Sequence, residues 1–388
     1  MISIFKRAES FLPSNKEKKA IEKEVNDFVD FLNKRIKKLN LDAEVFIGGG
    51  WAKDTWLSDP DIDIFLRFER ERNIGRAEEI LKGLEYEVVH GSRDYFKYKR
   101  FEIVPILKIK HFKEAKNITD LSPFHVDFVR DNLKRPKDVK LLKLFCKAAD
   151  VYGAESYIGG FSGYALELLI IKYRSIKRLF EAVESWKPKV VIDFGKREKL
   201  NEHKRKSPLI IYDPTYPGRN VSAALEYRNF SKFVFSVRSF LRKPSLKFFS
   251  LKKRTIQDIR KLSEKRGTKL FLKKIRIKGN KEVFLSKLRK DMKKIKSCLV
   301  RNGFSVYDYG FFECGNMANV FFELENWEIS KKGKHFGPPV WIDKKHFDEF
   351  LKKWGNVYVE GERMVADKKR ENNGIRLLKK IMKEHDYE

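Results

Sequence analysis

The chain has 388 residues, of which 42% are hydrophobic and 13% aromatic. It is therefore too long for one ordinary core, has enough apolar sequence for about two to four packed domains, and cannot be a disordered basic tail. Lysine and arginine outnumber aspartate and glutamate by 85 to 54, which leaves a formal charge of +31. Because such a charge opposes compaction unless a polyanion neutralises it, nucleic acid is the leading partner. A lysine-rich solvated surface is the alternative explanation of the charge alone.

The cysteine pattern and the hydropathy exclude two further classes of protein. Cys146, Cys298 and Cys314 are far apart and lack the spacing of zinc ligands, so we expect free, mostly buried thiols in a reducing cytosol. No apolar run approaches the roughly 18–20 residues of a membrane span, and the N-terminus has no signal-peptide pattern. These observations predict a soluble, cytoplasmic protein without a zinc site or a membrane partner.

The first third of the chain predicts a small mixed sheet with helices on one face. Ser14 and Glu17 have capping-box spacing, and apolar residues from Ile21 to Leu39 repeat at helical intervals, which predicts an amphipathic helix over 15–39. Strand-like runs follow at 43–48, 62–68, 85–90, 94–101 and 101–107. Short helices are expected near 52–57 and 74–84.

The rest of the chain predicts a helical region followed by mixed elements. Helical patterns cover 139–149, 164–185 and 222–241. Beyond residue 244 we expect strands at 268–277, 304–312 and 317–324, helices at 281–301 and 343–354, a hairpin at 357–366 and a charged peripheral helix within 367–388. The predicted fold class is α+β multidomain, with a catalytic head at 1–136, a helical central domain at 137–243 and an α+β body and tail at 244–388.

Chemistry is concentrated in the segment GGGWAKDTWLSDPDIDIF at residues 48–65. Asp61 and Asp63 are two positions apart in a predicted strand, so both carboxylates project from the same face. Two such carboxylates repel each other unless a divalent cation lies between them, and Mg²⁺ prefers hard oxygen ligands. The pair therefore predicts a metal site.

A glycine turn and a third acid extend this site. The glycines at 48–50 allow backbone N–H groups to approach a triphosphate, and Glu102 lies in the apolar run FEIVPIL, where a lone acid would be costly. Three acids with such a turn predict phosphoryl transfer with two metal ions. Each feature alone has another explanation: the acid pair could be a solvated strand end, the glycines a flexible turn, and Glu102 a solvent-facing edge residue. Their occurrence together in this order favours a catalytic site.

These motifs resemble the signature of the nucleotidyltransferase superfamily that includes DNA polymerase beta. From near the N-terminus to about residue 370, the chain is similar to the archaeal, class I CCA-adding enzymes. The further matching stretches are 105–125, 139–155, 159–170, 213–221 and 245–249. The resemblance implies a tRNA nucleotidyltransferase that adds C, C and A to the 3′ end of tRNA from CTP and ATP, using two Mg²⁺ ions and no nucleic-acid template.

The resemblance also implies roles for individual residues. It places the catalytic acids and metal ligands at Asp61, Asp63 and Glu102. It places the nucleotide contacts at Gly49, Gly50, Lys53, His125, Lys143 and Tyr152. Lysine ammonium groups suit phosphate oxygens, whereas the histidine and the tyrosine, taken alone, are more often packing residues.

The acceptor stem and T arm of tRNA are the implied partner. Basic residues interleaved with aromatic ones across 225–290 suit this role, although a charged helix surface explains any single residue there equally well. The sequence does not specify the oligomeric state and leaves a homodimer open. It also does not identify the side chains that distinguish cytosine from adenine.

The chain departs from the family pattern at three positions. Gly50 stands where the family normally has serine, Glu102 where it usually has aspartate, and Gly159 where it commonly has arginine. Two alternatives stay open for this reason: a tRNA-binding protein with weakened or lost transferase activity, and a transferase of the same fold with CC-only or poly(A) specificity. Retention of the three acids, Lys143 and Tyr152 favours the active enzyme.

Overall fold

The computed structural model describes residues 1–388 except 92, 196, 252–254, 386 and 388. The chain forms two compact units, Met1–Lys252 and Lys253–Glu388. None of the helices in the described part of the chain combines the length and apolar character of a membrane span. All three cysteines are free, but only Cys146 is buried, while Cys298 is half-buried and Cys314 exposed, so the expectation of mostly buried thiols is wrong.

The longest helix of the first unit, α2 (Asn15–Lys38), confirms the prediction for residues 15–39. Its N-terminus is closed by a capping box, in which the Glu17 N–H donates to the Ser14 hydroxyl and the Ser14 N–H donates to the Glu17 carboxylate. The apolar stripe is buried, and Phe28 stacks on Phe101 of the sheet with ring centroids 4.2 Å apart. The helix thus covers the sheet that carries the acids.

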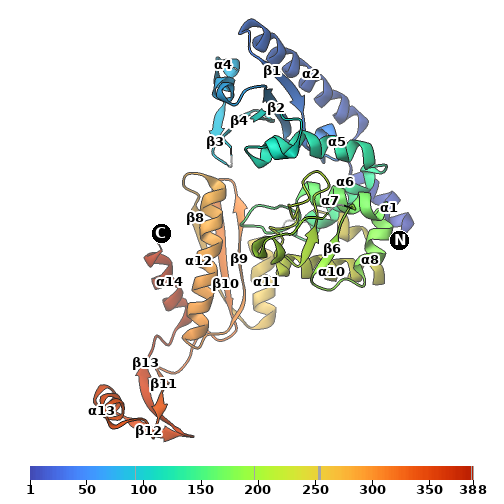
Figure 1. Ribbon diagram of the computed structural model, residues 1–388. Coiled ribbons are helices and arrows are strands. Elements are labelled where there is room, and N and C mark those ends of the chain that lie inside the picture. The colour runs from blue at the N-terminus through green and yellow to red at the C-terminus, as the bar shows by residue number, and fades with distance from the viewer. Residues whose placement is uncertain (92, 196, 252–254, 386, 388) are drawn as a thin grey trace. The chain divides into compact units, whose positions relative to one another are not determined.

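That sheet is mixed, with strand order β1-β2-β5-β4-β3 (Figure 1). Its strands are β1 (Ala43–Ile47), β2 (Ile62–Phe68), β3 (Glu87–Val89), β4 (Tyr95–Tyr98) and β5 (Phe101–Leu107). Only the central pair, β2 and β5, is parallel, and the other neighbours run antiparallel. The prediction of a small mixed sheet is confirmed.

The short helices of this region differ from the prediction. The helix expected at 52–57 is instead α3 (Gly49–Ala52), which starts within the glycines and ends before Asp54, a residue with a left-handed φ of 51°. A left-handed residue cannot continue an α-helix. The helix expected at 74–84 is reduced to α4 (Ala77–Leu81), which follows a 3₁₀ turn over Glu71–Arg76.

The central part of the first unit is helical. Its longer helices are α5 (Ser122–Asn132), α6 (Pro136–Ala148), α7 (Gly163–Tyr173), α8 (Ile176–Val183) and α10 (Tyr227–Arg242). The single helix predicted at 164–185 is wrong, because Arg174 has a left-handed φ of 64° and Ser175 caps a new helix through the Arg178 N–H. A parallel pair, β6 (Val190–Ile192) and β7 (Leu209–Ile211), and a short helix, α9 (Glu202–Arg205), were not predicted.

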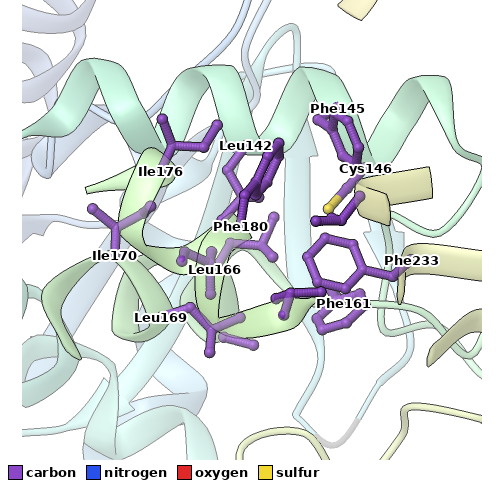
Figure 2. Close-up of a cluster of buried hydrophobic side chains, with 14 of the residues drawn as sticks. Leu142, Phe145, Cys146, Phe161, Leu166, Leu169, Ile170, Ile176, Phe180 and Phe233 are labelled. Carbon is purple, nitrogen blue, oxygen red and sulfur yellow. The ribbon is translucent and has the colours of Figure 1, made fainter. Parts of the chain in front are cut away.

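A hydrophobic core joins these helices (Figure 2). Its members shown in the figure include Leu142, Phe145, Cys146, Phe161, Leu166, Leu169, Ile170, Ile176, Phe180 and Phe233. The N-terminal helix α1 (Ile2–Ala8), which was not predicted, belongs to this core, since the ring centroids of Phe5 and Phe240 lie 5.4 Å apart. The apolar side of α6 packs in this core, and Lys140 and Lys143 of the same helix reach Asp54 and Thr55 beyond the glycine turn.

The second unit is α+β and contains two small antiparallel sheets, ordered β8-β10-β9 and β11-β13-β12. Its elements are α11 (Ile256–Arg266), β8 (Lys269–Arg276), α12 (Lys281–Arg301), β9 (Val306–Cys314), β10 (Met317–Leu324), β11 (Lys332–Pro339), α13 (Lys344–Lys353), β12 (Val357–Glu360), β13 (Arg363–Lys369) and α14 (Gly374–Glu384). The predicted hairpin is confirmed. The last helix is not peripheral, because Leu378 and Met382 are fully buried. The predicted α+β multidomain fold class is confirmed.

Candidate active site

Three carboxylates lie on one face of the sheet at its parallel centre. In the register of β2 and β5, Asp63 is directly paired with Glu102. Asp61 comes two residues before Asp63, immediately ahead of β2, and side chains two apart in extended chain share a face. The Asp61 side chain is 62% exposed and that of Glu102 25% exposed, so these two acids are open to a ligand, whereas Asp63 is more deeply placed. We call this group the acid edge.

The glycine turn presses against the acid edge. The Gly48 N–H donates to the backbone oxygen of Asp63 at 2.8 Å. Gly49 has a left-handed φ of 59°, and a Cβ at this position would lie 1.6 Å from Asp63 Oδ2. Any side chain at position 49 would therefore displace the carboxylate, which explains why glycine is required there.

The electrostatics of the acid edge show too little positive charge. Burial, followed by the negative charges of Glu102 and Asp61, raises the pKa of Asp63 to about 6, while Lys53 acts in the opposite direction. A carboxyl group that is hard to ionise among other carboxylates favours an added cation. Among the described residues, no group of three or more His, Cys, Asp or Glu side chains is arranged as a metal cluster as it stands.

A lysine that the sequence interpretation missed contacts this edge. Lys97 lies on β4, directly opposite Glu102 in the antiparallel register. Its Nζ is 3.3 Å from Asp61 Oδ1 and 3.4 Å from Glu102 Oε1. The run YFKYKRFE places lysine and acid on neighbouring strands, but only the structure provides the register that brings them together.

Two of the predicted nucleotide contacts, Lys53 and Lys143, meet in a buried ionic group next to the acid edge. Lys53 Nζ is 2.6 Å from Glu167 Oε2, and the Thr55 hydroxyl donates to Glu167 Oε1 at 2.5 Å. Lys143 Nζ donates to the backbone oxygen of Thr55 at 2.7 Å and lies 3.6 Å from Glu167. Glu167 is 1% exposed, so its charge is balanced inside the protein. We call these four residues the lysine–glutamate group.

Lys143 and Tyr152 also approach one point on α7. A Cβ at Gly163 would lie 3.3 Å from the Tyr152 hydroxyl and 3.4 Å from Lys143 Nζ. Burial lowers the pKa of Lys143 to about 8, although Glu167 acts in the opposite direction. Burial also raises the pKa of Tyr152, and nearby Glu167 adds to this shift. Tyr152 thus lies next to Lys143 and the rest of the lysine–glutamate group.

His125, on α5, belongs to a separate polar group. Its Nε2 is 3.1 Å from Asp213 Oδ2, and Arg219 Nη1 donates to the same carboxylate oxygen at 2.9 Å. Tyr164 and Thr215 donate to the other oxygen of Asp213. Burial alone would raise the pKa of Asp213, but the hydrogen bond to His125 and the charge of Arg219 hold it well below its usual range.

Comparison with known proteins identifies the family. Three family profiles match in order: a nucleotidyltransferase domain at residues 29–144, the second domain of tRNA nucleotidyltransferase at 137–250, and the C-terminal domain of the CCA-adding enzyme at 266–386. The chain is 35% identical to the CCA-adding enzyme of Nanoarchaeum equitans over 371 residues, which is 90% of this chain and 89% of that protein. This chain belongs to the CCA-adding enzyme family.

Other relatives agree with this membership. The CCA-adding enzymes of Saccharolobus shibatae and Methanosarcina mazei are 31% and 32% identical, cover 95% and 92% of this chain, and are themselves covered over 89% and 84% of their lengths. A solved structure of the Cid1 poly(U) polymerase matches 65% of this chain and 98% of its own with a TM-score of 0.50 at 14% identity, a likeness of fold alone.

This member of the CCA-adding enzyme family departs from the expected family pattern at Gly50 and Gly159, among other positions. These two glycines have different surroundings. A Cβ at Gly50 would meet its nearest atoms, in Trp56, at 3.5 Å and Lys143 Nζ at 3.7 Å, so serine would fit there. Gly159 has a left-handed φ of 64°, and a Cβ there would lie 2.9 Å from Glu226. Arginine at position 159 would therefore strain this loop.

The sequence interpretation missed Thr55, Glu167 and Asp213. Glu167 lies in the apolar helix run GYALELLII, where a lone acid is costly unless it is paired. That argument could have identified it as a site residue. Asp213 lies in the matching stretch DPTYPGRNV but carries no local signal of its partner His125, which is 88 residues away.

Proposed function

We propose that this chain adds C, C and A in turn to the 3′ end of tRNA from CTP and ATP, without a nucleic-acid template. The observation that carries the proposal is the acid edge, in which Asp63 and Glu102 are paired across parallel strands below the glycine turn. The names of the relatives and the C-terminal domain profile support the substrate class. The named relatives are CCA-adding enzymes, and none of them is named as a binding protein without activity or as a CC-only transferase.

Asp61, Asp63 and Glu102 are the residues that would hold divalent metal, which we propose to be two Mg²⁺ ions. The donor chemistry fits, because all three ligands are hard carboxylate oxygens, and burial together with the charges of Glu102 and Asp61 makes Asp63 hard to ionise without an added cation. When bound, the ions activate the attacking hydroxyl and neutralise charge on the triphosphate and the leaving pyrophosphate.

The chain's own lysines supply the remaining positive charge for the nucleotide. Lys53 lies close enough to Asp63 to lower its pKa and close enough to His125 to lower that pKa as well. Its charge therefore acts on both the acid edge and the His125–Asp213 pair, and in this proposal its ammonium group contacts the triphosphate. Lys143 on α6 adds a second ammonium group, the neutral Tyr152 hydroxyl lies near it at the start of α7, and the glycines at 49 and 50 let phosphate oxygens approach the backbone.

The three-domain division assigns further roles. In this proposal residues 1–136 carry the catalytic head, residues 137–243 close the nucleotide and primer site, and the basic body and tail at 244–388 contact the acceptor stem and T arm. Basic and aromatic side chains across 225–290 support backbone contacts of this kind.

Substitution of Glu102 tests the chemistry. Glu102→Gln keeps the size of the side chain but removes the anionic ligand, so nucleotide incorporation should fall by about three orders of magnitude or more while tRNA affinity stays nearly unchanged. Glu102→Asp, which keeps the charge, should retain or improve activity. Single-turnover incorporation and filter binding of tRNA measure the two quantities. Equal activity of Glu102→Gln and the wild type would remove Glu102 from the mechanism.

A matched set of RNA substrates tests the specificity. tRNA ending at the discriminator base, in C or in CC is incubated with Mg²⁺ and either CTP or ATP. Addition of CMP to the first two and of AMP to the third supports the proposal. Tight, salt-sensitive binding without incorporation would indicate a binding protein, and CMP addition without AMP addition a CC-only transferase.

A further inference from the structure

The Lys97 ammonium is placed between two of the three acids. Lys97 and Glu102 are cross-strand partners on β4 and β5, the closest side-chain relation in a sheet. The ammonium reaches Asp61 Oδ1 at 3.3 Å and Glu102 Oε1 at 3.4 Å. The ammonium thus connects Glu102 on β5 with Asp61, the residue just before β2.

We propose that Lys97 is the resident counter-ion of the acid edge, and that a divalent cation must displace its ammonium to bind there. Lys97 is a positioning residue in this view: it holds Asp61 and Glu102 in place before the metal arrives, and it lowers the metal affinity of the nucleotide-free protein. The inference rests on the proposed function, because it requires Asp61 and Glu102 to be metal ligands.

Charge repulsion favours a displacement. The Lys97 ammonium lies 3.3 Å and 3.4 Å from one oxygen of Asp61 and one of Glu102. A Mg²⁺ ion that takes these oxygens as ligands lies about 2.0–2.1 Å from each. The ion and the ammonium would then share the same two oxygens as close neighbours of like charge, and at that range they repel each other strongly. We therefore expect the ammonium to leave when the ion binds.

The chemistry of lysine makes this exchange feasible. The ammonium is a point charge on a flexible stem, and the Lys97 side chain is 40% exposed, so it can swing into solvent without disturbing the sheet. An arginine would resist removal more strongly, because its planar fork can hold carboxylates in a bidentate manner. Lys97 therefore keeps the acids from repelling each other and yet remains replaceable.

Metal binding to the nucleotide-free, full-length protein tests the inference. Mn²⁺ is the probe, because its free form is quantified directly by electron paramagnetic resonance. Lys97→Met removes the charge and keeps the stem, and its Kd for Mn²⁺ should be about tenfold lower than that of the wild type. Lys97→Arg should bind Mn²⁺ no more tightly than the wild type.

Lys99→Met is the matched control for the loss of one positive charge in the same β4–β5 hairpin. The Lys99 ammonium lies over the Tyr98 ring at 5.2 Å. This variant should change the Kd for Mn²⁺ by less than about twofold. A Lys97→Met protein with the Kd of the control, or with weaker binding than the wild type, overturns the inference. Melting temperatures verify that each variant is folded.

Asp63→Asn separates this inference from the proposed function. If Mn²⁺ binding depends on Asp63 and CMP is incorporated, but Lys97→Met binds like the control, then only the role of Lys97 is wrong. If Mn²⁺ binding is the same in Asp63→Asn and CMP is not incorporated by the wild type, the acid edge is not a metal site and both proposals fail.

Discussion

Asp63 and Glu167 are carboxylates of the same unit, yet their surroundings shift their pKa values in opposite directions. Burial and the neighbouring acids raise the pKa of Asp63 to about 6. Burial alone would raise the pKa of Glu167 too, but the charges of Lys53 and Lys143 and the hydrogen bond from Thr55 outweigh it and lower the pKa. The first carboxylate is placed among like charges, and the second is enclosed by opposite ones.

The difference separates carboxylates that lack counter-charges from a carboxylate that has two of them. In the lysine–glutamate group, Glu167 is paired with the ammonium groups of Lys53 and Lys143, which leaves one positive charge in excess. The acid edge has an excess of negative charge, although Lys97 lies at its rim and Lys53 and Lys147 act from a distance on Asp63 and Asp61. Lys53 belongs to the lysine–glutamate group and also lowers the pKa of Asp63 in the acid edge. Glu167 therefore holds in place a positive charge that acts on the acids.

The largest expected effect comes from removing the charge of Glu167. Glu167→Gln leaves Lys53 and Lys143 buried without an anion, which costs about 3–5 kcal/mol of unfolding free energy. The melting temperature of the first unit should fall by roughly 10 °C. Differential scanning calorimetry at pH 7 measures this change.

Asp63→Asn is the matched control for Glu167→Gln. It also replaces a carboxylate by an amide, but at a position where ionisation is unfavourable, so the melting temperature should stay the same or rise. Nucleotide incorporation should nevertheless be lost. If Asp63→Asn destabilises the protein as much as Glu167→Gln does, then the contrast between the two carboxylates is wrong.

A smaller effect concerns the pH dependence of Lys143. Its pKa is lowered to about 8, so the folded protein loses this positive charge above that pH, while the unfolded chain keeps it until the usual value of 10.5. Unfolding free energy should therefore rise with pH across this window, because the unfolded state binds more protons. The charge available to a triphosphate falls over the same range. The kcat/KM for CTP should drop up to tenfold per pH unit above pH 8.

Lys143→Arg tests whether Lys143 causes this falling limb. Arginine remains charged throughout the range, so the profile of kcat/KM for CTP between pH 6.5 and 9 should become flat above pH 8. A falling limb that persists unchanged in the arginine variant would assign the titration to another group.

Much of the fold follows from local patterns in the sequence. The capping box at Ser14 and the apolar stripe that follows it specify α2, and the runs at 62–68 and 101–107 coincide with β2 and β5. The break at Arg174 was missed because the apolar pattern continues across it, and only the left-handed φ and the serine cap end the helix. Short elements such as α1 depend on packing against Phe240 and Phe180, which no local pattern contains.

The candidate site likewise combines residues that local sequence patterns identify with residues that only tertiary packing brings together. Paired acids at a strand, a glycine turn and an acid within a later apolar strand are local signals, and the structure brings Asp61, Asp63 and Glu102 to one face. Glu167 is 114 residues from Lys53, and Lys97 depends on the register of β4 against β5. Partners of this kind are set by tertiary packing, so the sequence showed the charges that need compensation but not the groups that supply it.

The smallest expected effect is at Gly50, where the chain departs from the family's usual serine. The Cβ position is free of close contacts and lies 3.7 Å from Lys143 Nζ, so Gly50→Ser places a hydroxyl where the glycine turn meets the lysine–glutamate group. The KM for CTP should fall by about threefold at most, because one hydrogen bond in exchange for water adds little. Steady-state incorporation with CTP measures this.

Gly159→Arg provides the contrast for Gly50→Ser. Position 159 is left-handed and crowded by Glu226, so arginine should lower the melting temperature instead of restoring a contact. A Gly50→Ser protein that is folded but inactive would show that a triphosphate needs the bare backbone at position 50. In that case the absence of the hydroxyl is part of how this chain accommodates Glu102, whose longer side chain places its carboxylate differently from that of aspartate on the same strand.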